Sequence, residues 1–218
     1  MRQAVKNTAR KQRVPNAERR RVSIEAVLDS ALQLFVTQGY DATSMDDIAR
    51  SAGLTKGAVY FYFKDKLALA SDLLARTENE LFDPMYELIH QSRGTAADRI
   101  VIFTNWLAKM GGTRIELPLL HVLMSMEFHG RGNEVENRLQ DTYERLHVEI
   151  EKITSDGQAS GEFSDIVPPR EQAAVIVALI DGLLMEWHRG KEKLDGEILA
   201  RSARAMILNG ILNHGSET

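Results

Sequence analysis

The chain has no cysteine and few aromatic residues among its 218 positions. The absence of cysteine excludes disulfides and thiolate metal sites, and it fits the reducing cytoplasm better than secretion. Long apolar runs are missing too, since the longest, Ala173 to Ile180, is far below the roughly 20 residues that a membrane span needs. The basic N-terminus lacks the apolar segment of a signal peptide. We therefore expect a soluble, cytoplasmic protein with no membrane partner.

Charge is distributed unevenly along the chain. Residues 1–66 carry 12 lysines and arginines against 7 aspartates and glutamates, whereas the remaining residues carry a net charge of −9. A basic N-terminal segment on an acidic body is typical of a protein whose head binds a polyanion. A simple asymmetry of solvated charges explains the same numbers as well, so charge alone leaves the partner open.

Apolar residues recur at three- and four-residue spacing, and no stretch alternates long enough to predict a strand. The pattern therefore predicts an all-α protein. Gly39 and Gly53 are expected to end helices in the left-handed conformation that glycine adopts without strain. About nine helices result: one that ends at Gly39, followed by helices at about 45–52, 56–62, 65–91, 95–110, 116–128, 132–158, 169–189 and 196–213.

The second and third expected helices are separated by only a few residues around Gly53, which is the spacing of a helix-turn-helix. Thr43 and Ser44 precede Asp46 and Asp47 by three residues, a capping-box pattern that marks the start of the second helix. Thr55 is placed to cap the third helix in the same way. We expect three short helices in residues 22–66 to form one small domain.

The third helix has two different faces. Val59 and Phe63 share the face that can pack on the first helix. The opposite face carries two i,i+4 pairs directed at solvent, Lys56 with Tyr60 and Gly57 with Phe61. In a DNA major groove such a face could bond phosphates and guanine acceptors and touch thymine methyl groups. Packing of the two aromatic rings on the next domain is the alternative.

The segment TSMDDIARSAGLTKGAVYFYFKDKLAL resembles the N-terminal DNA-binding domain of the TetR/AcrR family of bacterial one-component transcription regulators. The resemblance covers residues from about 22 to 70 and departs at Tyr62, where the family often has His. It implies a homodimer whose subunits each carry three DNA-binding helices and a larger helical ligand domain. By this resemblance bases are faced by Thr55, Lys56, Ala58 and Phe61, and phosphates are held by Thr43, Tyr60 and Lys66.

Residues 67–218 are expected to form the ligand-binding and dimerisation domain. The helix at 169–189 is apolar nearly all round, so we expect the last two helices to pair with those of a second subunit. Asp181 interrupts this apolar helix and must be paired, reach water or meet a ligand. Together with residues on helices that the resemblance places around a cavity, the candidate ligand residues are Trp106, Met110, His121, Met124, Phe128, Asp181, Met185 and Trp187.

These observations predict a ligand-responsive transcription regulator, in particular a repressor that a small lipophilic effector releases from a palindromic DNA operator. No cofactor is expected. A regulator without a small ligand, or one that acts as an activator, is the first alternative. The second is a helical metal enzyme, because Glu144 and His147 stand at the i,i+3 spacing of di-iron proteins. No second copy of that pair is present.

Residues 1–21 hold eight basic residues and one acidic residue, and we expect them to form a flexible arm. Such an arm can lie along phosphates or enter a minor groove, or it can be a solubilising tail with no fixed position. Deletion of residues 1–15 is predicted to lower DNA affinity and to flatten the dependence of that affinity on salt, because lysine and arginine contacts release counterions. Binding titrations at several salt concentrations measure this slope. Equal slopes for the intact and shortened chains would show that the arm does not touch DNA.

Overall fold

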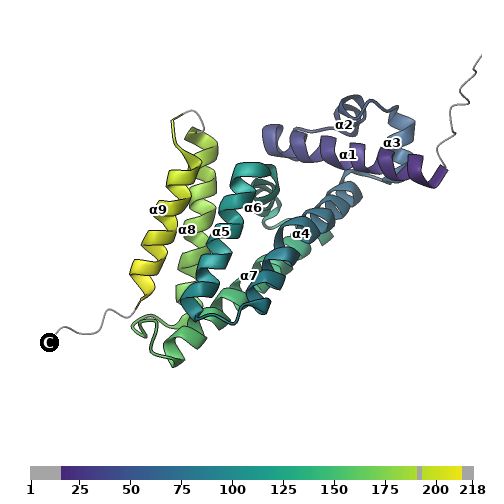
Figure 1. Ribbon diagram of the computed structural model, residues 1–218. Helices are drawn as coiled ribbons and strands as arrows, with labels where there is room; N and C mark the ends of the chain where they lie inside the picture. Colours follow the sequence, from purple (N-terminus) through teal and green to yellow (C-terminus); the bar gives the residue numbers. More distant parts are fainter. Residues whose placement is uncertain (1–15, 191–192, 213–218) are drawn as a thin grey trace, which may run out of the picture.

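The computed structural model describes residues 16–190 and 193–212, and these residues form nine α-helices and no β-sheet. The all-α class predicted from the sequence is confirmed, and apart from the start of α1 the predicted helix boundaries differ from the observed ones by less than a turn. Figure 1 shows the order of the helices, which are α1 (Asn16–Gln38), α2 (Met45–Ser51), α3 (Lys56–Tyr62), α4 (Lys66–Gln91), α5 (Ala96–Thr113), α6 (Glu116–Phe128), α7 (Glu134–Ala159), α8 (Pro169–Gly190) and α9 (Gly196–Ile211).

Helices α1 to α3 form a small head at one end of the molecule (Figure 1). Ser44 caps α2 in a reciprocal capping box with Asp47, and Thr55 caps α3 by accepting a hydrogen bond from the Ala58 amide. These side chains satisfy backbone N–H groups that have no partner within the helix. Gly39 and Gly53 have φ angles of 88° and 68°, so both chain reversals use the left-handed region as expected. The head is therefore a helix-turn-helix with α3 as its last helix.

Helices α4 to α9 form the larger body. α4 leaves the head and runs beside α7 across the body, while α8 and α9 lie on the side away from the head (Figure 1). α9 packs on α5 and α8, and α8 packs on α7. Within residues 16–190 and 193–212, no helix has the length and apolar character needed to cross a bilayer.

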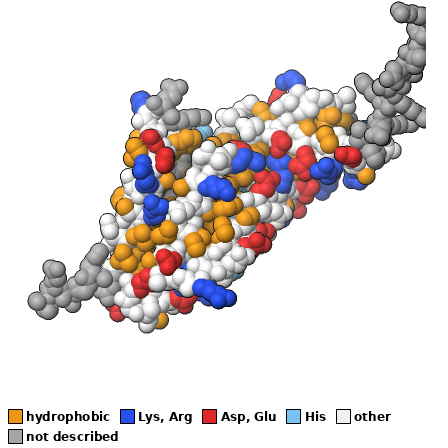
Figure 2. Space-filling model, in the orientation of Figure 1, with side chains coloured by type: hydrophobic (Ala, Val, Ile, Leu, Met, Phe, Trp, Pro, Cys, Tyr) orange, Lys and Arg blue, Asp and Glu red, His pale blue; other side chains and the backbone are white. Residues whose placement is uncertain are grey.

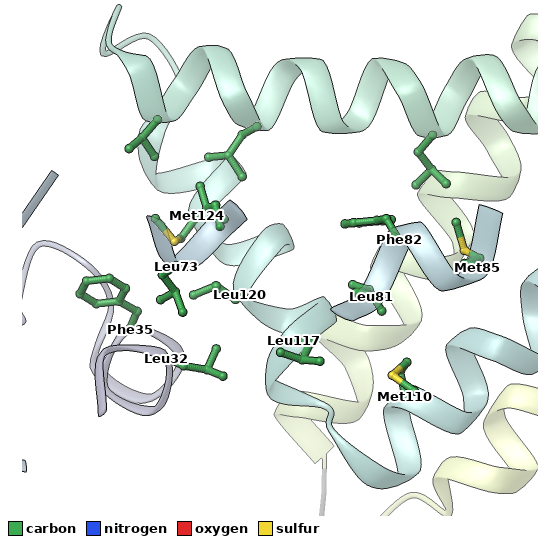
Figure 3. Packing of buried hydrophobic residues seen from close by; sticks show 14 of the residues in the cluster. Leu32, Phe35, Leu73, Leu81, Phe82, Met85, Met110, Leu117, Leu120 and Met124 are labelled. Carbon is green, nitrogen blue, oxygen red and sulfur yellow. The ribbon is translucent and has the colours of Figure 1, made fainter. Parts of the chain in front are cut away.

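One hydrophobic core continues from the head into the body. Figure 3 shows Leu32 and Phe35 of α1 beside Leu73 of α4 and beside Leu120 and Met124 of α6. All five side chains are almost fully buried. Because these residues leave water together, the head gains stability from the orientation in which it meets α4 and α6.

The start of α1 corrects one prediction. α1 begins at Asn16, so residues 16–21, which were expected to belong to a flexible arm, are helical. The side chain of Arg19 donates to the Asn16 side-chain oxygen at 2.6 Å, and arginine and glutamate are good helix formers. The rest of the predicted arm, residues 1–15, lies outside the described residues.

The close approach of α7 to the following loop leads to a stability prediction. A Cβ atom at Gly157 would overlap the ring of the buried residue Phe163, whereas a Cβ at Gly112 meets nothing within 4 Å. Gly157→Ala should lower the free energy of unfolding by about 1–3 kcal/mol, the usual cost of overpacking. Gly112→Ala should stay within about 1 kcal/mol of the parent. Urea denaturation measures both values, and equal losses would contradict the prediction.

Candidate DNA-binding surface and ligand cavity

The solvent-facing side of α3 carries the residues predicted to meet bases. Phe61 is 77% exposed and Tyr60 is 44% exposed, which is unusual for aromatic side chains in a folded head. The Lys56 ammonium lies 2.9 Å from an Asp46 carboxylate oxygen, and this hydrogen bond raises the pKa of Lys56. Because both groups are mostly in water, the ion pair is weak and Lys56 can exchange it for DNA. This face of α3 therefore presents one cation and two aromatic rings to a partner.

The first turn of α3 leaves room for another molecule to come close to its backbone. The Thr55 hydroxyl oxygen accepts from the Ala58 amide at 3.2 Å, so its role in this structure is capping. Gly57 is exposed, and no atom lies within 4 Å of the position that a Cβ would occupy. Nothing in the described chain obstructs a DNA backbone here. The contacts predicted for Thr55, Gly57 and Ala58 stay predictions.

Two side chains predicted to hold phosphates point into the protein instead. Thr43 is 1% exposed, and its hydroxyl donates to the Gly39 carbonyl at 2.7 Å. The Lys66 ammonium donates to the carbonyls of Tyr40 and Thr43, both at 2.7 Å, and lies 4.1 Å from the Tyr40 ring centroid. Burial lowers the pKa of Lys66. Carbonyls that converge in a tight turn need a donor, and Lys66 supplies it. The phosphate contacts of Thr43 and Lys66 stay predictions.

The same turn is held from the body by a carboxylate that no sequence pattern singled out for this role. Glu127, near the end of α6, accepts from the backbone amides of Tyr40 and Asp41 at 2.9 and 2.7 Å. Arg131 donates to both carboxylate oxygens of Asp41 at 2.9 and 2.6 Å and to the Glu127 carbonyl at 2.7 Å. We call these contacts, together with those of Lys66, the turn clamp. The partners are far apart in sequence, so no local spacing indicates them.

His121 of α6 is buried in the middle of the body. Its Nε2 lies 2.9 Å from the Thr77 hydroxyl, which itself donates to the Leu74 carbonyl at 3.0 Å. The Thr77 hydroxyl is therefore within hydrogen-bonding distance of two partners, and the tautomer of the His121 ring sets which group donates in the contact between them. Nδ1 of the same ring is buried without a partner in the described chain. Burial lowers the pKa of His121 to about 3, so the ring is neutral at pH 7.

Asp181 and His121, both predicted ligand residues, line one small buried cavity of about 30 Å³. Tyr143 lines it as well, and its hydroxyl donates to the Asp181 carboxylate. Burial raises the pKa of Asp181 to about 6, although the Tyr143 hydrogen bond and the charge of His147 act in the opposite direction. Burial also raises the pKa of Tyr143. A cavity of this size holds a water molecule, and a larger ligand requires its apolar walls to move.

The other candidate ligand residues do not line this cavity. The Trp106 indole N–H donates to the Leu81 carbonyl at 2.7 Å. The Phe128 ring packs on Tyr40 with centroids 4.6 Å apart and so belongs to the junction with the head. Three methionines occupy core or half-buried positions elsewhere, and these are Met110, Met124 and Met185. The sequence could place them on apolar helix faces but could not separate core from cavity.

A larger hollow lies between α5, α8 and α9 and has a volume of about 750 Å³. Its walls include Trp187, and Arg201 and Arg204 lie at its edge. We call it the α5–α8–α9 groove. Only Trp187 among the candidate ligand residues lines it, because the groove depends on how α9 packs on α5, about 100 residues earlier in the chain.

The residues that suggested a metal site are engaged elsewhere. Glu144 pairs with Arg170 at 3.5 Å, and the His147 Nδ1 lies 2.8 Å from the Tyr143 carbonyl. In the part of the chain that the structure describes, no three His, Asp or Glu side chains cluster so that they could share a metal ion.

A helix-turn-helix head joined to a helical body with a small, mainly apolar cavity is typical of one-component DNA-binding regulators. Comparison with known families agrees with this class. Residues 27–73 match the family described as bacterial regulatory proteins, tetR family, and residues 130–211 match the C-terminal region of BetI-type transcriptional repressors. The chain belongs to the TetR family, and it is a transcription regulator, not an enzyme.

Individual relatives support this assignment over most of the chain. The crystal structure of the MbdR regulator from Azoarcus sp. CIB is 38% identical, has a TM-score of 0.80, and is matched over 88% of this chain and 100% of that one. The transcriptional regulator AcrR of Shigella flexneri is 27% identical over 191 residues, 84% of this chain and 86% of AcrR. FadR from Bacillus subtilis in complex with stearoyl-CoA shares the fold at 21% identity, with a TM-score of 0.70 over 86% of this chain and 98% of that one.

The exposed position of Lys56 leads to a prediction about base readout. Lys56→Ala should relax base preference at one position per half-site, with a loss of about 1–3 kcal/mol of discrimination. Lys152→Ala removes the same charge from an exposed position of α7 and should change neither affinity nor preference. Binding to a matched duplex and to single-base variants measures the effect. Equal losses on all duplexes would assign Lys56 to phosphate contact.

The partly buried carboxylate of Asp181 leads to a prediction about pH. Its folded-state pKa of about 6 exceeds the ordinary 3.8, so ionisation costs stability as the pH rises from about 4 to 6. Asp181→Asn avoids this cost and can still accept the Tyr143 hydrogen bond. The variant should be more stable than the parent by up to about 3 kcal/mol at pH 8 and equally stable at pH 4.

Urea denaturation at pH 4, 6 and 8 measures this difference. Asp141→Asn, at an exposed position of α7, is the matched control and should show no pH-dependent difference. A constant difference between Asp181→Asn and the parent at all three pH values would contradict the prediction.

Proposed function

We propose that the protein binds a palindromic DNA operator as a homodimer and that a small lipophilic effector, on entering the helical body, releases it. The observation that carries the proposal is the exposed face of α3, where Lys56, Tyr60 and Phe61 have no core to pack on. Two copies related by a two-fold axis would insert their α3 helices into successive major grooves, which requires an operator of matching symmetry.

The dimer is proposed to form through α8 and α9. Val175 of α8 is 66% exposed and Met206 of α9 is 65% exposed, and both lie on the outer faces of their helices. Gly182 and Gly210 on the same faces have open space where a Cβ would stand. Exposed apolar side chains beside small residues favour close packing of two helices from each subunit into a four-helix interface.

An effector is proposed because the body contains polar groups that its own residues leave incompletely satisfied. Nδ1 of His121 is buried without a partner in the described residues, and Asp181 is a carboxylate in an apolar wall. Each of these costs free energy that a ligand hydrogen bond can recover. The structure of FadR from Bacillus subtilis is a complex with stearoyl-CoA, a molecule with a long apolar chain. Apolar walls with a few polar groups suit a lipophilic ligand with one polar substituent.

We propose that the effector releases DNA by moving α6 as well as α4. α6 carries His121 in the cavity and Glu127 in the turn clamp, less than two turns apart. A shift of α6 that accommodates a ligand would therefore move the turn between α1 and α2 and with it the position of α3. Because the two α3 helices must match a fixed groove spacing of roughly 34 Å or its multiples, a small displacement is enough to weaken binding. A coupling of about 1–3 kcal/mol would reduce operator affinity about 5- to 150-fold.

Selection from random duplex DNA tests the proposed function. The full-length protein should enrich an inverted repeat, and complexes on that repeat should have the mass of one or two dimers. Enrichment of a single half-site, or of no sequence, would overturn the proposal of a dimer on a palindrome. Lys56→Ala should enrich a repeat with one degenerate position in each half.

Glu127→Gln tests the turn clamp on the selected operator. The amide keeps an acceptor but loses the charge that holds two backbone N–H groups, so operator affinity should fall about 5- to 50-fold while helix content stays unchanged. Glu134→Gln makes the same change in charge at an exposed position in the first turn of α7 and should have little effect. Equal affinities for the parent and Glu127→Gln would exclude the clamp from the coupling route.

A further inference from the structure

The α5–α8–α9 groove has the dimensions of a small-molecule site. Its volume of about 750 Å³ falls within the range of sites that bury drug-sized ligands. The walls are mainly apolar and come from all three helices, with Leu107 from α5, Leu183 and Trp187 from α8, and Leu199 from α9. In Figure 2 hydrophobic side chains gather over this end of the molecule, and Lys or Arg side chains stand beside them over α9.

The groove continues toward the buried polar cavity. Leu107, Ile180 and Leu184 line both the groove and the cavity that contains Asp181. These apolar side chains border both hollows, and leucine and isoleucine can change rotamer without loss of a hydrogen bond. A long apolar chain in the groove would therefore point toward Asp181 and His121.

The edge of the groove carries cations that the chain leaves without a counterion. Arg201 and Arg204 lie one turn apart on α9, and neither forms an ion pair within residues 16–190 and 193–212. Arg204 donates to the Asn105 side-chain oxygen of α5, which fixes its direction. Glu116 at the other wall is already paired with an arginine at 2.5 Å, and Glu197 lies one turn before Arg201. Paired guanidinium groups of this kind favour a carboxylate or phosphate.

The groove and the proposed dimer surface use opposite faces of α8. The groove side holds residues at i, i+4 and i+7 spacing, namely Ile180, Leu184 and Trp187. The dimer side holds Val175 and Gly182, which do not line the groove. A second subunit packed on the Val175 face of α8 therefore leaves these three α8 side chains available to a ligand.

We propose that the α5–α8–α9 groove binds an amphipathic organic anion. Its carboxylate or phosphate head lies on Arg201 and Arg204, and its apolar chain lies on Trp187 and Leu184 and extends toward the Asp181 cavity. This inference rests on the proposed function, because it names the chemical class of the effector and the route by which it reaches the buried cavity.

Calorimetric titration of the full-length protein with decanoate and with 1-decanol tests the anion preference. The double variant Arg201→Gln, Arg204→Gln should weaken decanoate binding about tenfold or more and decanol binding less than about twofold, because only the charged head meets the guanidinium groups. Arg189→Gln removes an exposed arginine of α8 that does not line the groove, and it should change neither affinity. Thermal unfolding without probe verifies that the variants are folded.

Tryptophan fluorescence locates the bound probe. The chain has two tryptophans, and Trp106→Phe leaves Trp187, a groove residue, as the only reporter. Decanoate should change this signal over the concentration range measured by calorimetry. No change in the signal, or equal losses of decanoate and decanol affinity in the double variant, would overturn the proposal. The selection of an inverted repeat uses no probe, so it can succeed when the groove proposal fails.

Discussion

The turn between α1 and α2 is clamped from two sides, and the position of the DNA-binding head depends on this clamp. The Lys66 ammonium binds the carbonyls of the turn, while the Glu127 carboxylate binds its amides. Charge-assisted hydrogen bonds are stronger and more directional than neutral ones. The hydrophobic contacts of Leu32 and Phe35 hold the head against the body, but apolar packing alone is non-directional. The clamp therefore supplies directional contacts that orient the head relative to the body. The apolar core supplies much of the stabilisation of the contact between them.

The body combines a large apolar core with a few buried polar groups, and these groups explain how one fold can respond to a ligand. His121 is neutral because burial lowers its pKa, and Asp181 ionises only above about pH 6 because burial raises its pKa. Both groups stand in a cavity that is too small for an effector in this structure. The energetic cost of leaving them partly satisfied is the physical basis for a ligand-dependent rearrangement.

α8 has separate uses for its opposite faces, and α9 contributes side chains to both surfaces. The outer faces combine exposed apolar side chains with glycines that leave space for a second backbone. The inner faces meet α5 and form a groove whose cations lie at its edge. A helix that is apolar nearly all round, as α8 is in sequence, must pack against other groups on both sides. One face of α8 lines the groove, and the opposite face is the proposed dimer surface.

The sequence by itself determined the all-α class, most helix boundaries, the helix-turn-helix and the exposed face of α3, because periodicity, capping residues and glycines act over a few neighbouring residues. It also singled out Asp181, since a carboxylate in an apolar helix is visible without a structure, whereas His121 was a candidate through the family resemblance. Only the tertiary structure turned Thr43 and Lys66 inward, brought Glu127 to the α1–α2 turn and opened the groove between α5 and α9. These contacts join residues distant in the chain, and their geometry is determined by how whole helices pack, which local spacing does not encode.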